Sequence, residues 1–242
     1  MIGTTLEPGL LTGVVPVFYS PGLDRQASEV SDHLTTGCFC LREILGSETP
    51  RLQAMVLSEA DWDRAPRESK RPYPFGLPYF TRSTETPTLV FPSELSEALQ
   101  PRTNLTTPLT VWHELAHAFF LDREPVKMPL WLGELVPQAA SAAVALREGV
   151  PLKEHLSRIE PTGFTVREFT LPASAGDQMR FQNLLLLFGV AAVRRFGDGF
   201  LLRLIRSMRD ESEVVDGNRA TELFAASLGG DGSGWLSRRE EF

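Results

Sequence analysis

The hydrophobic positions at the start of the chain predict two strands that flank one long helix. Residues 14–20, VVPVFYS, form an apolar run that ends at Pro21-Gly22, which is typical of a short strand. Apolar residues then recur every three or four positions from Leu23 to Leu45, and Gly46 stands where a helix C-cap is expected. Residues 51–58, RLQAMVLS, give the second strand.

The next part of the chain predicts a loop followed by a third strand. Residues 61–83 are polar and rich in proline and aromatic residues, which indicates a long loop. Residues 87–93, PTLVFPS, read as a strand with a proline near each end. Because proline cannot donate a hydrogen bond to a neighbouring strand, this pattern favours an edge strand.

The second half of the chain predicts mostly helices. Thr107-Pro108 is typical of a helix start, and that helix should extend to about Leu121. A second helix begins at Leu130 or a few residues later and extends to Arg147. We also expect a strand-like segment at 164–171 and helices at 152–159, 177–196, 199–208 and 219–228. The glycine-rich residues 229–234 are expected to form a flexible turn.

This order of elements predicts an α+β fold. A small N-terminal mixed β-sheet with a long helix would be followed by a mostly helical C-terminal half. We expect one domain over residues 1–242, with the sheet in residues 1–105 and the helical half in residues 106–242.

Composition and charge narrow the possible partners and location. The chain is 42% hydrophobic and 23% charged, which is ordinary for a globular protein, and its net charge of -7 does not favour nucleic acid. A membrane-spanning helix is not expected, because no run of 18 apolar residues occurs. The opening residues do not resemble a signal peptide. Cys38 and Cys40 are too close in sequence for a disulfide between them to stabilise the fold. We therefore expect a cytoplasmic protein with reduced thiols.

The candidate chemistry lies in residues 111–120, VWHELAHAFF. His113 and His117 are four residues apart on a predicted helix, so both imidazoles project from one face. Two such nitrogens can hold a Zn²⁺ ion at about 2.0–2.1 Å. Glu114 can reach a metal-activated water without being a ligand, as a general base must.

A catalytic zinc site needs a third protein ligand, and Glu134 is the preferred candidate. It lies in PLWLGELVPQAAS, across a loop long enough to reverse the chain, so that two antiparallel helices could bring the carboxylate opposite the histidines. Asp122 and Glu124 are alternatives, but they lie in or just past the end of the histidine helix and would have to reach back along it. His33 and His155 lie among polar residues and are expected at the surface.

HELAHAFF followed by PLWLGELV resembles the gluzincin zinc metallopeptidases, most of all the small bacterial peptidase-MA-like group. The resemblance is specific over residues 111–138 and loose over most of the chain. It implies a minimal thermolysin-like architecture in which His113, His117 and Glu134 hold Zn²⁺ and Glu114 is the catalytic base. The implied activity is hydrolysis of a peptide or protein substrate, which would lie beside the strand at 87–93.

Two positions depart from the family pattern. Pro137 follows Glu134 closely, and it is tolerated only if that helix begins near Glu134, where its missing N–H is no loss. Phe181 stands where the family's downstream helix often has a tyrosine, and relatives use tyrosine or histidine to stabilise the oxyanion. The candidates to replace that tyrosine are Tyr79, Tyr73 and Arg180. The alternative function is therefore a catalytically impaired zinc-binding protein of the same fold, acting as an interaction module.

Overall fold

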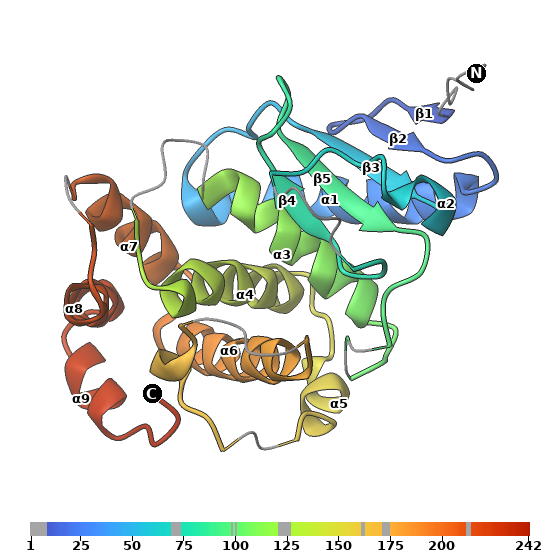
Figure 1. Cartoon of the computed structure of the whole chain (residues 1–242). Coiled ribbons are helices and arrows are strands. Elements are labelled where there is room, and N and C mark those ends of the chain that lie inside the picture. The colour runs from blue at the N-terminus through green and yellow to red at the C-terminus, as the bar shows by residue number, and fades with distance from the viewer. Residues whose placement is uncertain are drawn as a thin grey trace.

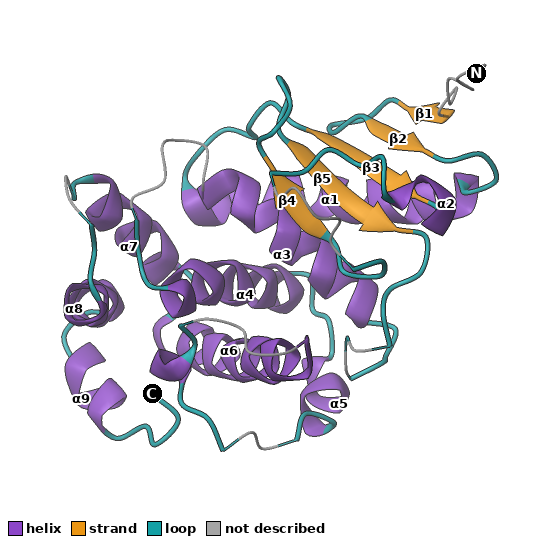
Figure 2. Ribbon diagram, in the orientation of Figure 1, coloured by secondary structure: helices purple, strands orange, loops and turns teal. Residues whose placement is uncertain are grey.

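The computed structural model describes residues 9–68, 74–97, 99, 101–120, 127–160, 163–170, 175–211 and 214–242. A small mixed sheet formed by the N-terminal part of the chain lies on one side, and the remainder is mostly helical (Figures 1 and 2). The predicted α+β class is therefore confirmed.

The sheet has five strands in the order β1-β2-β3-β5-β4. β2, β3 and β5 run parallel to one another, and β1 and β4 are antiparallel to their neighbours. The strands predicted at 14–20, 51–58 and 87–93 are confirmed as β2, β3 and β5. The bounds are β1 Gly9–Leu11, β2 Val17–Tyr19, β3 Gln53–Leu57, β4 Tyr79–Thr81 and β5 Thr88–Pro92.

β5 is an inner strand, so the prediction of an edge strand at 87–93 is wrong. The edge strand on this side is β4, which lies within the segment predicted as a loop and pairs Phe80 with Leu89. The two prolines are compatible with an inner strand because they lie at its ends. Pro87 precedes β5 and accepts a hydrogen bond from the Gln53 N–H at 3.0 Å, and Pro92 is the last residue of the strand.

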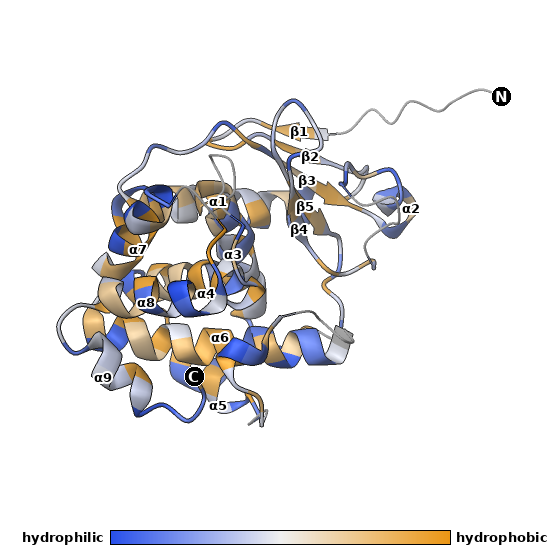
Figure 3. Cartoon of the chain, turned by 60° about the vertical axis from the view of Figure 1, so that its left-hand side comes forward, coloured by the Kyte–Doolittle hydropathy of each residue, from blue (hydrophilic) through white to orange (hydrophobic). Residues whose placement is uncertain are grey.

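Four long helices build the helical side of the molecule. α1 (Asp24–Leu45) packs on one face of the sheet and ends at Gly46, whose φ of 59° is the left-handed conformation predicted for a C-cap. α3 (Thr106–Phe120) packs on α1, α4 (Leu130–Arg147) on α3, and α6 (Ala175–Phe196) on α4. Figure 3 shows hydrophobic residues along much of α4 and α6, and one hydrophobic core connects the sheet to these helices.

The shorter helices complete the fold. The predicted helices at 152–159, 199–208 and 219–228 are confirmed with small shifts of their ends as α5, α7 and α8, and α2 and α9 were not predicted. The bounds are α2 Glu59–Trp62, α5 Leu152–Ser157, α7 Gly199–Arg209, α8 Gly217–Leu228 and α9 Gly232–Ser237. α9 occupies part of the segment expected to be a glycine-rich turn.

The strand predicted at 164–171 is wrong over its described residues. Val166–Glu168 form a short 3₁₀ helix, η1, which starts with a capping box. In that box the Thr165 side chain accepts from the Glu168 backbone N–H, and the Thr165 N–H donates to the Glu168 carboxylate at 2.6 Å. The capping box therefore outweighs the alternating hydrophobic pattern.

α4 begins at Leu130, so Pro137 lies inside the helix rather than near its start. The expectation that this helix would begin near Glu134 is wrong. A proline at this position removes the hydrogen bond that its N–H would give to the carbonyl of Gly133, the residue just before Glu134. Pro137 is buried, and the helix continues past it to Arg147.

Candidate metal centre

α3 is fixed against α1 along the side that carries Trp112 and Leu115. The indole N–H of Trp112 donates to the backbone carbonyl of His33 at 2.9 Å. Gly37 on α1 allows this close contact, because a Cβ there would lie 2.7 Å from the Leu115 side chain and 2.8 Å from Trp112. His33 is half-buried with its ring edge-on to Trp112, so it lies only partly at the surface where it was expected. This packing leaves another side of α3 to face α4.

The start of α3 also differs slightly from the prediction. The helix begins at Thr106 rather than Thr107. The Thr106 hydroxyl donates to the Pro101 carbonyl at 2.8 Å and accepts from the Thr103 N–H at 3.0 Å. These bonds anchor the first turn, and Pro108 lies within it, where a missing N–H is tolerated.

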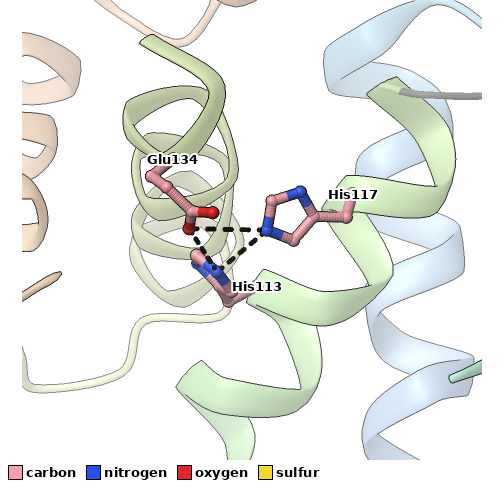
Figure 4. A group of neighbouring side chains, drawn as sticks. All are labelled: His113, His117 and Glu134. Carbon is pink, nitrogen blue, oxygen red and sulfur yellow. Dashed lines mark hydrogen bonds and ion pairs between the residues drawn. The ribbon is translucent and has the colours of Figure 1, made fainter. Parts of the chain in front are cut away.

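His113 and His117 from α3 meet Glu134 from α4, as Figure 4 shows. The two Nε2 atoms are 3.2 Å apart. Glu134 Oε2 lies 3.3 Å from Nε2 of His113 and 3.6 Å from Nε2 of His117. The structure therefore brings together the three side chains that the sequence analysis selected as metal ligands.

The spacing of these three atoms fits a zinc ion. With bonds of roughly 2.0–2.1 Å and tetrahedral angles, two ligand atoms on one zinc lie about 3.3 Å apart. The three observed separations, 3.2, 3.3 and 3.6 Å, lie close to that value. Two imidazole nitrogens and one carboxylate oxygen are also a donor set that zinc accepts. The group can therefore hold a metal ion without moving its side chains far.

Two glutamines that the sequence analysis missed extend this group. Gln182 Nε2 on α6 donates to Glu134 Oε2 at 2.7 Å, and Gln138 Nε2 on α4 donates to Gln182 Oε1 at 2.6 Å. Gln138 lies four residues after Glu134, on the same side of the helix. That spacing was visible in the sequence, whereas the contact with α6 depends on the fold.

One nitrogen of the group lacks a partner. Nδ1 of His113 is buried and has no hydrogen bond among the residues that the structure describes. In zinc sites this second nitrogen usually donates to a carboxylate or carbonyl, which orients the ring. The orientation of the His113 ring therefore depends on packing within α3 and α4 and on its contact with Glu134.

The charged states of Glu134 and His117 stabilise each other. Burial alone would raise the pKa of Glu134, but His117 and His113 hold it well below its usual value. Burial alone would lower the pKa of His117, but the Glu134 carboxylate outweighs this and raises it. Glu134 is therefore ionised at neutral pH, which is the state that a metal ligand requires.

Glu114 is buried beside the histidines, and its carboxylate belongs to the same site. Burial raises the pKa of Glu114, while His113, His117 and a hydrogen bond from the Phe80 backbone lower it to a smaller extent. The Phe80 backbone, on the edge strand β4, therefore lies next to the carboxylate. Glu114 thus lines the site from α3, next to the sheet.

A cavity of about 130 Å³ opens beside His113 and Glu114. Glu114 is the one Asp, Glu, Lys or Arg among its described lining residues. The apolar part of the lining consists of Leu77, Pro78, Leu99, Pro101, Leu109, Met179 and Leu186. His155 also lines the cavity, with Nδ1 2.7 Å from the Thr103 hydroxyl. Because His155 is buried, the expectation that it lies at the surface is wrong.

The other predicted site residues lie apart from the three ligand candidates. The Tyr79 hydroxyl donates to the Pro66 carbonyl at 3.1 Å, and its ring packs with Trp62 and Val90 in a separate small cluster. Arg180 is exposed and lies 3.8 Å from Asp177. The structure therefore does not bring Tyr79 or Arg180 to the metal group.

Phe181 is buried between two other rings. Its ring centroid lies 4.5 Å from that of Phe164 and 4.8 Å from that of Phe169, in stacked geometry. The side of α6 that faces Glu134 carries the neighbouring residue, Gln182. Tyr73, Asp122 and Glu124 lie outside the described residues.

No protein-family model matches the chain, and no curated protein sequence matches it. Among solved structures, the chain is similar to the crystal structure of Legionella pneumophila aminopeptidase A in complex with aspartic acid. The TM-score is 0.48 and the sequence identity is 16%, over 92% of this chain and 26% of that chain. The chain therefore spans about a quarter of that aminopeptidase's length. Among the described residues, no helix is both long and apolar enough to span a membrane.

Proposed function

We propose that this chain is a zinc-dependent peptidase of gluzincin type, with one domain over residues 1–242 that carries the site. The observation that carries the proposal is the meeting of His113, His117 and Glu134 at zinc-like separations, with Glu114 beside them. Metal ligands alone would equally suit a structural site. A buried carboxylate that is not a ligand, facing a cavity beside them, is what hydrolysis requires in addition.

The roles of the residues follow from their positions. His113, His117 and Glu134 would hold the ion. When bound, zinc supplies Lewis-acid polarisation of a carbonyl and a water of lowered pKa. Glu114 would accept a proton at its carboxylate and return it to the leaving amine. The Phe80 backbone of β4 lies beside that carboxylate.

The substrate would lie beside β4 rather than beside β5. β4 is the edge strand next to the metal group, and its Phe80 backbone lies beside Glu114. An extended peptide can add to such an edge through backbone hydrogen bonds. The cavity beside Glu114 would then accept one uncharged side chain of the substrate, since its lining is largely apolar and Glu114, its one described Asp, Glu, Lys or Arg, would be occupied as the base.

A second candidate function is a metal-binding protein of the same fold that has lost catalysis. It is favoured by the position of Phe181, whose ring cannot donate a hydrogen bond and is enclosed by Phe164 and Phe169. The Tyr79 hydroxyl is bonded to the Pro66 carbonyl, and the Arg180 side chain lies at the surface. None of these three described side chains supplies an oxyanion donor at the metal group.

A cleavage assay separates the two functions. The zinc-loaded chain is incubated with a broad peptide library, and the products are identified by mass spectrometry, with Glu114→Gln as the matched control. We expect cleavage by the wild type and a loss of about 10²–10⁴-fold in Glu114→Gln, which should keep its zinc. A zinc-loaded wild type that cleaves nothing would leave the interaction module as the better description.

A further inference from the structure

A chain of side-chain hydrogen bonds connects α4, α6 and the metal group. Gln138 on α4 donates to Gln182 on α6 at 2.6 Å, and Gln182 donates to Glu134 on α4 at 2.7 Å. Both contacts are short for N–H···O bonds. The path therefore starts and ends on α4 and passes through α6, which packs against it along its length (Figure 1).

The Glu134 carboxylate, which can only accept, fixes which end of the Gln182 amide faces it. The NH₂ group of Gln138 is bonded to the Gln182 carbonyl oxygen, so the NH₂ group of Gln182 must turn the other way, toward the carboxylate. A reversed Gln182 amide would place its carbonyl against the Glu134 carboxylate and its NH₂ group against that of Gln138. The contact with Glu134 would then be repulsive, because acceptor would meet acceptor; the Gln138 amide can present either end and follows the direction of Gln182.

The bond from Gln182 also determines the direction of Glu134. It reaches Oε2, the same oxygen that lies 3.3 Å from Nε2 of His113 and 3.6 Å from Nε2 of His117. A carboxylate oxygen can accept at more than one lone pair, so the bond to Gln182 leaves another directed at the histidines. Because Gln182 is neutral, it holds the carboxylate without cancelling the charge that a cation would need.

We infer that Gln182 is a positioning residue of the metal centre and that Gln138 anchors the carbonyl end of its amide. The inference rests on the proposed function only in requiring that the three side chains hold a metal ion. Residues that hydrogen-bond to a ligand fix its geometry, and their loss typically lowers metal affinity by about 10–100-fold. Gln182 should therefore contribute to affinity without touching the ion.

The test is the affinity of the full chain for Zn²⁺, measured by competition with a chromophoric chelator, with the visible absorption spectrum of the Co²⁺ form as a second readout. We expect Gln182→Leu to weaken zinc binding about 10–100-fold and to change the Co²⁺ spectrum. Gln178→Leu is the matched control, because Gln178 lies one turn earlier and lines the same cavity without a described bond to Glu134. Its zinc affinity and Co²⁺ spectrum should equal those of the wild type.

Variants of Gln138 give a second, independent test of the inference. Gln138→Leu should weaken zinc binding less than Gln182→Leu does, because the donor to Glu134 is still present. In the Gln182→Leu background the same change should have no further effect, since the two residues act through one path. Melting of the metal-free proteins checks folding, and Gln182→Met is a second variant of similar length if leucine unfolds the chain.

The possible outcomes separate the inference from the proposed function. Zinc affinity within twofold of wild type in both Gln182→Leu and Gln182→Met overturns the inference alone. Independent, additive losses for Gln138→Leu and Gln182→Leu overturn the role given to Gln138. The expected affinity losses in a chain that cleaves no peptide would support the inference and overturn the peptidase function. A wild type that binds neither Zn²⁺ nor Co²⁺ overturns both.

Discussion

At the scale of single residues, the sequence alone could predict the three candidate ligands, because their prediction depends mostly on spacing along the chain. His113 and His117 share one helix, so their spacing alone places both rings on one side of it. Glu134 required only the assumption that the chain turns back after α3. Gln182 could not be found in this way, because its contact with Glu134 depends on how α6 packs on α4, some 48 residues along the chain.

The first prediction concerns the ligands. Removing one of three protein ligands leaves two, which rarely hold zinc. We therefore expect His113→Ala to lose its zinc and Glu134→Ala to bind it far more weakly than wild type, as counted by mass spectrometry of the intact protein. Asp122→Ala and Glu124→Ala should bind like wild type. Full occupancy of His113→Ala, or a loss caused by Asp122→Ala instead of Glu134→Ala, would contradict the assignment.

The second prediction concerns the two thiols. Burial raises the pKa of both Cys38 and Cys40 to about 11. The reactive thiolate is therefore about 10⁻³ of each thiol at pH 8, compared with roughly a quarter in an unfolded chain. Alkylation by iodoacetamide at pH 8 should be slow in the native protein and fast in urea, as followed by mass increase. Fast labelling of native protein would show that these side chains are accessible.

At the scale of elements, the helices were predicted well and the sheet less well. Helices such as α1 and α6 are long enough to repeat their hydrophobic pattern over several turns, which defines both type and extent. β1 and β4 have three residues each, too few to show an alternating pattern. The position of β5 inside the sheet follows from its pairing with β4, which the prolines at its ends do not reveal.

The third prediction concerns the contact between α4 and α6. Gly189 lies two turns after Gln182, and a Cβ there would be 2.9 Å from Ala139 Cα and 3.1 Å from its backbone nitrogen. Since backbone atoms cannot turn aside, Gly189→Ala must push the helices apart. We expect it to lower the free energy of unfolding by about 1–3 kcal/mol in urea denaturation.

Gly189→Ala should also weaken zinc binding, because Gln182 would move away from Glu134. Gly217→Ala is the control, since a Cβ at Gly217 meets no atom within 4 Å. It should change stability by no more than about 0.5 kcal/mol. Equal stability of the two variants would indicate that α4 and α6 can separate at little cost.

At the scale of the whole molecule, the candidate ion would connect two helices that belong to one core. α3 packs on α1 and on β4, whereas α4 packs on α6. The histidines come from α3 and Glu134 comes from α4, so the ion would join these two helices. An ion that binds the folded chain and not the unfolded one stabilises it by mass action. Metal binding should therefore be visible as stability of the entire chain.

The fourth prediction follows from this coupling. At a free zinc concentration of 100 times Kd, the folded state gains about 2.7 kcal/mol, which for a chain of this size raises Tm by roughly 5–10 °C. EDTA should reverse the gain, as measured by differential scanning fluorimetry. His113→Ala should melt at the same temperature with and without zinc. An equal rise in wild type and His113→Ala would mean that zinc acts elsewhere on the chain.

Pro137 has a mechanical consequence for α4. Without its N–H the helix lacks the link to the Gly133 carbonyl, and prolines are the commonest points at which helices bend. The turn that carries Glu134 lies before Pro137. The alanine-rich part of α4 lies after Pro137, close to α6. The turn that carries Glu134 is therefore joined to the rest of α4 by one backbone hydrogen bond fewer than in an uninterrupted helix, so its position depends more on neighbouring contacts such as the bond from Gln182.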